Sequence, residues 1–174
     1  QPELAVHGRP AHAEPLGRVA QQVRGTLLEG ADRVTVRSDG DTRVRGDATW
    51  LARAVANLLD NALVHSAPDT PVEVEVRRGA SDVVLSVRSH GEVVRHVRTR
   101  LFRRFVSTRL DRGGTGLGLA IVRAVAESHG GRAELAREGP PMVEFCLVLP
   151  SAWRKPDAEG GASLPPAAAE SEDS

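Results

Sequence analysis

Cysteine is almost absent from this sequence of 174 residues, in which Cys146 is the only one. A single thiol excludes a disulfide framework within one chain. It lies in an alternating apolar run, residues 142–149, where we expect it to be buried and unreactive. Long apolar runs are also missing, because none approaches the roughly 18 residues of a membrane-spanning helix. We therefore expect a cytoplasmic protein, or the cytosolic part of a protein whose membrane anchor lies elsewhere.

The sequence has no excess of either charge, since 23 Lys and Arg residues balance 23 Asp and Glu residues. A chain of zero net charge lacks the overall field of a protein that binds nucleic acid or membranes, so any electrostatic site must be local. Residues 95–112 are strongly basic, which indicates either a solvated surface or a local positive field. Only Phe102 and Phe105 are aromatic there, which argues against stacking on nucleic acid. The arginines of this segment are Arg95, Arg98, Arg100, Arg103, Arg104, Arg109 and Arg112.

The apolar pattern is that of a single domain. With 40% hydrophobic residues, the chain is long enough for one core of ordinary size. We place this domain at residues 14–150, after a flexible lead-in at 1–13. Residues 151–174 are rich in Ala, Pro, Ser and Glu and are expected to be disordered.

Helical and alternating periodicities place the elements of this domain. Helical spacing is found over about 16–28, 48–65 and 117–128, with Asp47 as the N-cap of the second helix. Alternating runs predict strands at 33–38, 42–46, 72–76, 82–87, 132–137 and 142–149, in antiparallel-style pairs. We therefore predict an α/β fold, a two-layer sandwich of one mixed, mostly antiparallel sheet with about three helices on one face.

Two asparagines stand four residues apart on the second helix, so Asn57 and Asn61 share one face, and His65 roughly continues their row. At 100° per residue this row lies off the centre of the leucine stripe and borders the core. A carboxamide oxygen can ligate Mg²⁺, which otherwise keeps waters and substrate phosphates. The pair could equally cap or bridge neighbouring loops, and the helix alone leaves both interpretations open.

A glycine-rich stretch, residues 113–119, precedes the third helix. Its glycines would let backbone amides approach an anion at the positive end of a helix dipole. It lacks the Gly-Lys-Ser/Thr ending of a P-loop and does not follow a strand as a dinucleotide fingerprint does. A flexible hinge before a helix is the alternative interpretation.

A strand-to-turn junction follows residues 82–88, where Ser89 and His90 precede a turn at Gly91. Junctions of this kind often carry ligand-binding groups. It is either an ordinary turn, with His90 exposed, or a binding site that has lost its usual carboxylate.

The order of these segments resembles the ATP-binding catalytic domain of bacterial sensor histidine kinases. An NLLDNA helix is followed by a strand and a glycine turn, then by LFRRF, and then by GGTGLGLAIVRAVAESHGG. The resemblance covers roughly residues 14–150. It implies the Bergerat fold shared with DNA gyrase and related ATPases, and it implies binding of ATP and Mg²⁺.

By this resemblance, Asn61 ligates the Mg²⁺ that bridges the ATP phosphates, and Asn57 lies beside it as the second catalytic asparagine. Hydrolysing relatives have a glutamate base at the Asn57 position. An asparagine cannot activate water in that way, which fits transfer of the γ-phosphate to a protein histidine.

The same resemblance assigns the segments around the nucleotide. Leu101, Phe102 and Phe105 match the F box, whose aromatics anchor a mobile ATP lid at residues 103–113. Arg109 falls where many short-lid relatives carry a basic residue, and the amides of residues 114–119 would cradle the triphosphate. The implied ATP-binding residues are Asn57, Asn61, His65, Ser89, Gly91, Arg109, Gly114, Thr115, Gly116, Leu117, Gly118 and Leu119.

Two departures from the family pattern weaken this expectation. Family members usually carry D-x-G-x-G after the third strand, where this sequence has Ser89, His90, Gly91, Glu92 and Val93. A serine accepts a hydrogen bond without charge, so we expect ATP binding to be weaker by about tenfold. The residue before His65 is a valine, where many relatives have a lysine or arginine.

The sequence therefore predicts the catalytic domain of a two-component histidine kinase. Its partners would be a histidine-bearing dimerisation domain, which we do not find in this chain, and a response regulator. Membrane contact would come only through other parts of the full protein, as in an inner-membrane sensor. One alternative is a degenerate nucleotide-sensing or protein-docking module of the same fold. Another is an anti-sigma-factor serine kinase, which usually keeps a glutamate where Asn57 stands.

Overall fold

The computed structural model of the chain describes residues 12–103 and 117–152. Within them, two small strands and a five-stranded sheet are joined by helices. In chain order the elements are β1 (His12–Pro15), α1 (Leu16–Thr26), a 3-10 turn (Ala31–Arg33), β2 (Val34–Asp39), β3 (Arg43–Gly46), α2 (Ala48–His65), β4 (Val72–Arg78), β5 (Asp82–His90), α3 (Arg95–Arg98), α4 (Gly118–Ser128), β6 (Arg132–Glu138) and β7 (Met142–Pro150).

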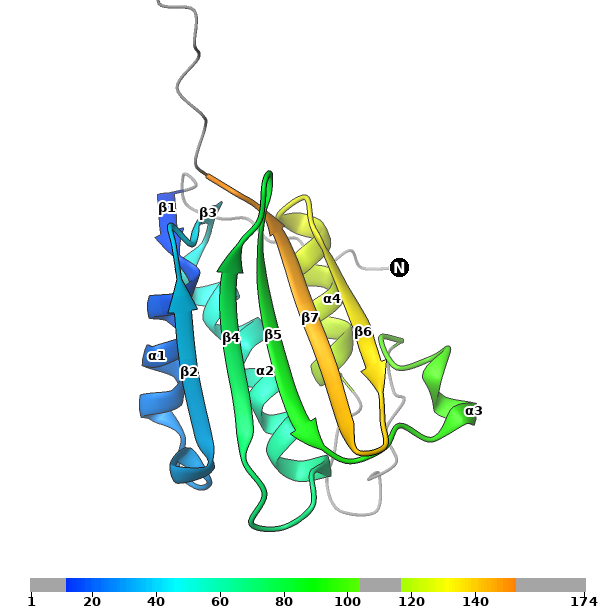
Figure 1. The fold of residues 1–174 in the computed structure, drawn as a ribbon. Coiled ribbons are helices and arrows are strands. Elements are labelled where there is room, and N and C mark those ends of the chain that lie inside the picture. Colours follow the sequence, from blue (N-terminus) through cyan, green and yellow to red (C-terminus); the bar gives the residue numbers. More distant parts are fainter. Residues whose placement is uncertain (1–11, 104–116, 153–174) are drawn as a thin grey trace, which may run out of the picture.

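The main sheet has the strand order β2-β4-β5-β7-β6. Strand β2 runs parallel to β4, and the other neighbours are antiparallel. Helices α1, α2 and α4 lie behind this sheet in Figure 1 and cover one of its faces. The predicted two-layer α/β sandwich with a mixed sheet is therefore confirmed.

The two faces of the sheet differ because side chains alternate along each strand. Val83, Leu85 and Val87 of β5 are buried and belong to the hydrophobic core between the sheet and the helices. On the opposite face Arg88 lies between two acids, 3.1 Å from Glu75 and 3.0 Å from Glu144. The hydrogen bond to Glu144 raises the pKa of Arg88, so this guanidinium stays charged.

Cys146 lies on the charged face of the sheet and is nevertheless buried, as the sequence predicted. Its sulfur is 3.4 Å from the hydroxyl oxygen of Ser86 on the neighbouring strand. Burial raises the pKa of the Cys146 thiol and keeps it protonated. In the described part of the chain, no helix combines the length and the apolar character needed to cross a membrane.

Two sequence expectations about the elements need correction, and one element was not predicted. Residues 33–38 and 42–46 do not form a hairpin, because β2 joins β4 in parallel whereas β3 pairs with β1. His12 and Ala13, which we expected in the flexible lead-in, are paired in β1. The basic segment contains a short helix, α3, whose four residues are too few to show a helical periodicity in the sequence.

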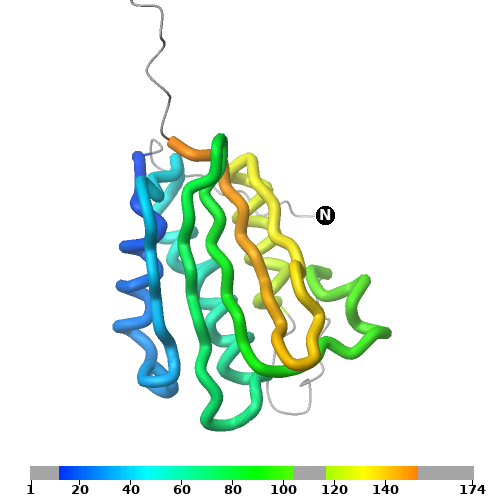
Figure 2. Tube along the Cα trace, in the orientation of Figure 1, coloured from blue at the N-terminus to red at the C-terminus, as the bar shows by residue number. Residues whose placement is uncertain are grey.

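The first and last described residues meet at β3. Strand β1 pairs with it along its length, and Ser151 forms a bridge to Val44 after the end of β7. The amide of Ala152 also donates to the carbonyl of Arg43 at 2.8 Å. Figure 2 shows that β1 and the end of β7 lie at the same edge of the domain.

Helix α2 begins where the sequence predicted. The Asp47 carboxylate accepts hydrogen bonds from the amides of Thr49 and Trp50, which satisfies donors that would otherwise be free. His129, just after α4, reaches this corner: its Nε2 accepts from the Asp47 amide at 3.3 Å. Its Nδ1 lies 2.7 Å from the carbonyl of Val125 and donates to it. One imidazole thus joins the start of α2 to the end of α4.

The His129 ring leaves no room beside Gly46. A Cβ added at Gly46 would lie 2.4 Å and 2.5 Å from two ring atoms of His129. Alanine there must displace the ring and break the joint between the helices.

We expect Gly46→Ala to lower the free energy of unfolding by about 1–3 kcal/mol, because overpacking forces side chains from their minima. Urea denaturation of the whole chain measures this loss. Gly25→Ala in α1 is the matched control, since nothing lies within 4 Å of a Cβ there. When His129 is also replaced by alanine, Gly46→Ala should lower the free energy of unfolding by less. An equal loss with and without the His129 ring would show that the ring is not the obstacle.

Candidate functional site

Helices α2 and α4 run antiparallel, and this brings the asparagine row of α2 to the start of α4. The end of α4 lies at Asp47, whereas its first residue, Gly118, lies beside Asn57. A Cβ added at Gly118 would be 3.4 Å from the carboxamide oxygen of Asn57. Asn61 is one turn further along α2, at 1.5 Å per residue, and so extends past the beginning of α4.

In the described part of the chain, no group caps the N-terminus of α4. Leu117 occupies the N-cap position without a side-chain hydrogen bond, and the first turn contains no acid. At the other end of the same helix pair, α2 is capped by Asp47. The first amides of α4 are therefore free to bind an anion, and the helix dipole favours negative charge there.

The side chains of Asn57 and Asn61 are half-buried beside this helix start. Within residues 12–103 and 117–152 neither carboxamide makes a hydrogen bond, and no fully buried side-chain polar atom lacks one. Both groups therefore keep contact with solvent although they border the core. Because they are unpaired in the described ranges, these two carboxamides can donate hydrogen bonds to a bound ligand or accept them from it. Their oxygens can also ligate a hard cation.

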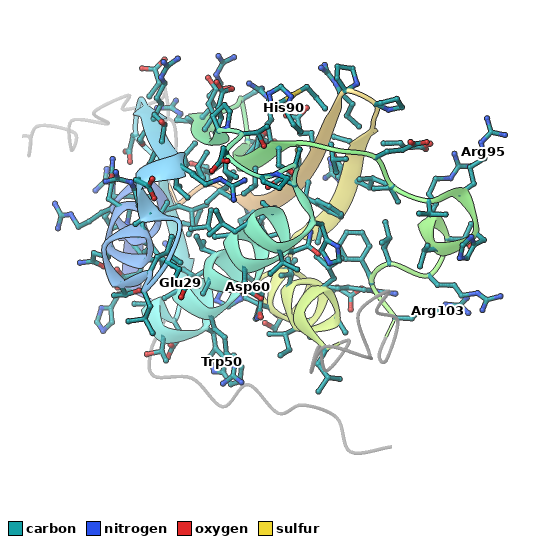
Figure 3. The ribbon with its side chains drawn as sticks, turned by 90° about the horizontal axis from the view of Figure 1, so that it is seen from below. Glu29, Trp50, Asp60, His90, Arg95 and Arg103 are labelled. Atoms are coloured by element: carbon teal, nitrogen blue, oxygen red, sulfur yellow. The ribbon has the colours of Figure 1, made fainter. Side chains whose placement is uncertain are left out.

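Ser89 lies at the end of the helix-facing row of β5, in line with the core residues Val87 and Leu85. The structure corrects the sequence prediction here: Ser89 and His90 are the last residues of the strand rather than part of the turn. Ser89 is 7% exposed, and its hydroxyl has no hydrogen-bond partner in the described part of the chain. His90, labelled in Figure 3, is half-buried as the last residue of β5.

The end of β5 is held from two sides by backbone hydrogen bonds. The carbonyl of His90 accepts from the amide of Ala67, in the loop after α2, at 3.1 Å. The amide of Gly91 donates to the carbonyl of Pro141, in the β6–β7 turn, at 2.9 Å. Gly91 also packs near the His65 carbonyl, where an added Cβ would lie at 3.4 Å. The last turn of α2 and the end of β5 thus form one corner of the domain.

The segment after this corner contains α3 and the first part of the expected F box. Phe102 packs edge-on against Phe145 of β7, with ring centroids 6.0 Å apart. Arg98 forms an ion pair with Glu138 of β6 at 2.7 Å. Figure 3 shows α3 projecting from the body of the domain, with Arg95 and Arg103 on this projection.

The structure brings together Asn57, Asn61, Gly118 and the neighbours of Gly118 at the start of α4. Ser89, Gly91 and His65 gather at the corner next to them, with His65 exposed as the last residue of α2. The remaining predicted residues lie outside the described ranges: Arg104, Phe105, Arg109, Arg112, Gly114, Thr115 and Gly116. Sequence reasoning missed Ala67 and Pro141, which hold the corner, and Glu138, which binds Arg98 after it, because no local pattern encodes these contacts.

The donor set suits a Mg²⁺ ion that arrives with phosphates and does not suit a metal held by protein alone. Among the described residues no group of three or more His, Cys, Asp or Glu side chains could hold a metal ion. Mg²⁺ commonly keeps waters and substrate phosphates together with one or two protein oxygens. A single carboxamide oxygen, such as that of Asn61, is enough for that arrangement.

The sequence matches a known family over residues 46–152, which is more than half of the chain. That family is described as "Histidine kinase-, DNA gyrase B-, and HSP90-like ATPase". The chain belongs to this family. The match includes α2, β5 and α4, the three elements that form the candidate site. The resemblance of the chain to the ATP-binding catalytic domain of sensor histidine kinases is confirmed by this match and by the relatives below.

Sensor histidine kinases are prominent among its relatives. The kinase domain is 37% identical over 125 residues to the sensor histidine kinase component HK1 of Mycobacterium tuberculosis, covering 70% of this chain and 73% of HK1. It is 35% identical over 160 residues to the sensor protein IrlS of Burkholderia pseudomallei, covering 87% of this chain. The chain spans only 33% of the length of IrlS.

Solved structures agree with this assignment. The catalytic domain of the histidine kinase ThkA superimposes with a TM-score of 0.70 at 22% identity, covering 82% of this chain and 97% of that one. At this identity the likeness shows the shared fold. The mycobacterial sensor histidine kinase MprB gives a TM-score of 0.65 at 29% identity, covering 80% of this chain and 97% of that one.

Gly118→Ala tests whether the space beside Asn57 is part of the binding site. The methyl group would fill the space beside the Asn57 carboxamide, in van der Waals contact with its oxygen at 3.4 Å. A ligand that uses this space would be excluded, so we expect Mg-ATP affinity to fall about fivefold, or about 1 kcal/mol. Alanine also favours helices, so stability should not fall. Isothermal titration measures the affinity, with Gly25→Ala as the control for a glycine-to-alanine change in a helix. Affinity equal to wild type would place the ligand elsewhere.

Proposed function

We propose that this chain is the catalytic domain of a two-component histidine kinase, which binds Mg-ATP and transfers the γ-phosphate to a histidine on a separate domain. The proposal rests on one observation above all. The uncapped start of α4 lies against Asn57, in a row with Asn61, and neither carboxamide is committed to a partner in the described part of the chain. This arrangement offers amide donors, a positive helix end and a cation ligand side by side.

The residues of the chain have distinct parts in this proposal. The amides of Gly118 and Leu119 bind phosphate oxygens, and the oxygen of Asn61 ligates Mg²⁺. When bound, Mg²⁺ supplies charge neutralisation for the transferred phosphoryl group. Asn57 orients the phosphates and cannot take a proton from water, because a carboxamide is not a base at neutral pH. These groups position the phosphate for attack by a histidine and give no activation of water.

Phosphoryl transfer then depends mainly on positioning and on charge. Arg109 and the amides of Gly114, Thr115 and Gly116 belong to the proposed lid and phosphate cradle. The acceptor would be a dimerisation domain that carries a histidine, and a response regulator would receive the phosphate afterwards. We place the domain in the cytoplasm, where ATP is available, with any membrane anchor in another part of the full protein.

Ser89 favours a second candidate, a nucleotide-sensing module of the same fold with little kinase activity. It occupies the buried end of β5, where a carboxylate would give a charged hydrogen bond to the exocyclic amine of adenine. Hydrogen bonds to charged groups contribute roughly 1.5–3 kcal/mol, against about 1 kcal/mol for neutral ones. The hydroxyl of Ser89 keeps contact with solvent and can accept from adenine directly or through a water.

A titration of Mg-ATP into the whole chain tests the binding step. We expect Asn61→Ala to lose most of the Mg²⁺-dependent affinity, at least about tenfold, because it removes the proposed metal ligand. Gln22→Ala, which removes an exposed carboxamide from α1, should bind as wild type does. If Asn61→Ala binds Mg-ATP as well as wild type, the metal assignment is wrong.

Ser89→Asp separates the two candidates. We expect the aspartate to raise ATP affinity about tenfold, since it restores a charged acceptor at the end of β5. Phosphate transfer from radiolabelled ATP to a histidine-bearing dimerisation domain, supplied separately, then measures kinase activity. A wild-type chain that transfers phosphate is a working kinase. A wild-type chain that binds ATP and transfers none, while Ser89→Asp transfers it, is the sensing module.

A further inference from the structure

Arg33, at the end of the 3-10 turn before β2, makes three hydrogen bonds to a single loop. Its Nε donates to the carbonyl of Thr70 at 2.8 Å, and one terminal nitrogen donates to the hydroxyl of Ser66 at 2.6 Å. The same nitrogen donates to the carbonyl of Ala67 at 3.1 Å. The guanidinium therefore binds both ends of residues 66–70, the loop that connects α2 to β4.

This loop lies between the two halves of the proposed nucleotide site. It begins directly after His65, one turn beyond Asn61 on α2. It ends at β4, whose first residue, Val72, pairs with Ser89 on β5. Near its start, the amide of Ala67 donates to the carbonyl of His90. The loop thus connects the asparagine end of the site to the serine end.

The loop has some structure of its own, which Arg33 completes. The hydroxyl and the amide of Thr70 both donate to the carbonyl of Ala67, at 2.6 Å and 3.3 Å, and these bonds close a turn. Asp69 in this turn has a positive φ of 58°. Among residues 12–103 and 117–152, no side chain of the turn bonds to β2, whereas Arg33, directly before β2, binds both ends of the turn.

We propose that Arg33 is a positioning residue for nucleotide binding: by clamping residues 66–70 it sets the spacing between Asn61 and Ser89. This inference rests on the proposed function. An adenine nucleotide has to engage both ends at once, so a loop that relaxes costs affinity even when each end stays intact. The planar guanidinium directs donors to separate acceptors in a fixed geometry, which a lysine ammonium does not reproduce.

Arg33→Met tests the clamp, because methionine keeps much of the apolar stem and removes every donor. We expect the Mg-ATP affinity of the whole chain to fall about tenfold, which corresponds to about 1.4 kcal/mol. Hydrogen exchange at the Ala67 amide should become faster, because its bond to His90 loosens. Isothermal titration measures the Mg-ATP affinity, and NMR measures the exchange rate of the Ala67 amide. Both are measured below the unfolding temperature of each variant. A chain that is merely less stable would show faster exchange throughout and unchanged affinity.

Arg24→Met is the matched control. Arg24 also uses its Nε to bind a backbone carbonyl, that of Val34 at 2.6 Å, but it lies on α1 and does not contact the loop. We expect its affinity for Mg-ATP and its Ala67 exchange to equal those of wild type. If Arg24→Met weakens binding as much as Arg33→Met, the loop is not the cause.

Ser66→Ala removes one of the three bonds and leaves the guanidinium in place, so it serves if Arg33→Met does not fold. We expect Ser66→Ala to lose two- to threefold in Mg-ATP affinity, and to cause no further loss when it is added to Arg33→Met.

An Mg-ATP affinity of Arg33→Met within twofold of wild type overturns the inference. Weaker binding with unchanged hydrogen exchange at the Ala67 amide also overturns it. A wild-type chain that binds no Mg-ATP contradicts the proposed function itself, whereas binding that Arg33→Met leaves unchanged contradicts only the role of Arg33.

Discussion

The antiparallel contact between α2 and α4 is the constraint on which the proposed site depends. At one end His129 joins the two helices, accepting from the Asp47 amide and donating to the last turn of α4. At the other end Gly118 fits against Asn57. The joint at His129 therefore fixes how far α4 reaches along α2, and with it which asparagine lies beside the helix start and which extends past it. A shift of one turn would bury Asn61 beside α4 and remove it from the proposed phosphate site.

Much of this arrangement was predictable because it is encoded locally. The Asp47 cap, the leucine stripe of α2 and the alternating strands each follow from residues close in sequence, and they fixed the layers of the fold. Strand partners were harder to predict. The alternation at 33–38 gives a strand but does not say that β2 runs parallel to β4, because its partner lies across a whole helix. His12–Pro15 carry no alternation, so the pairing of β1 with β3 could not be predicted.

The site shows the same division. The 100° geometry of a helix placed Asn57 and Asn61 at the border of the core, but it could not say that this border faces α4. Ser89 was expected just after the end of the strand because Gly91 follows it, whereas pairing with Val72 and Val143 extends the strand through His90. Arg33 gave no signal at all, since its three partners lie 33 to 37 residues away in the sequence. Contacts of this range appear only when the chain is folded.

The meeting of both described chain ends at β3 determines how any attached domain can use the site. Strand β3 leads directly into the start of α2, whereas the site lies at the other end of that helix. An 18-residue helix is about 27 Å long. A domain attached at this edge would have to reach along nearly the whole length of α2 to meet a nucleotide bound at the proposed site. Contacts made at β3 would then govern that reach without involving any residue of the proposed site.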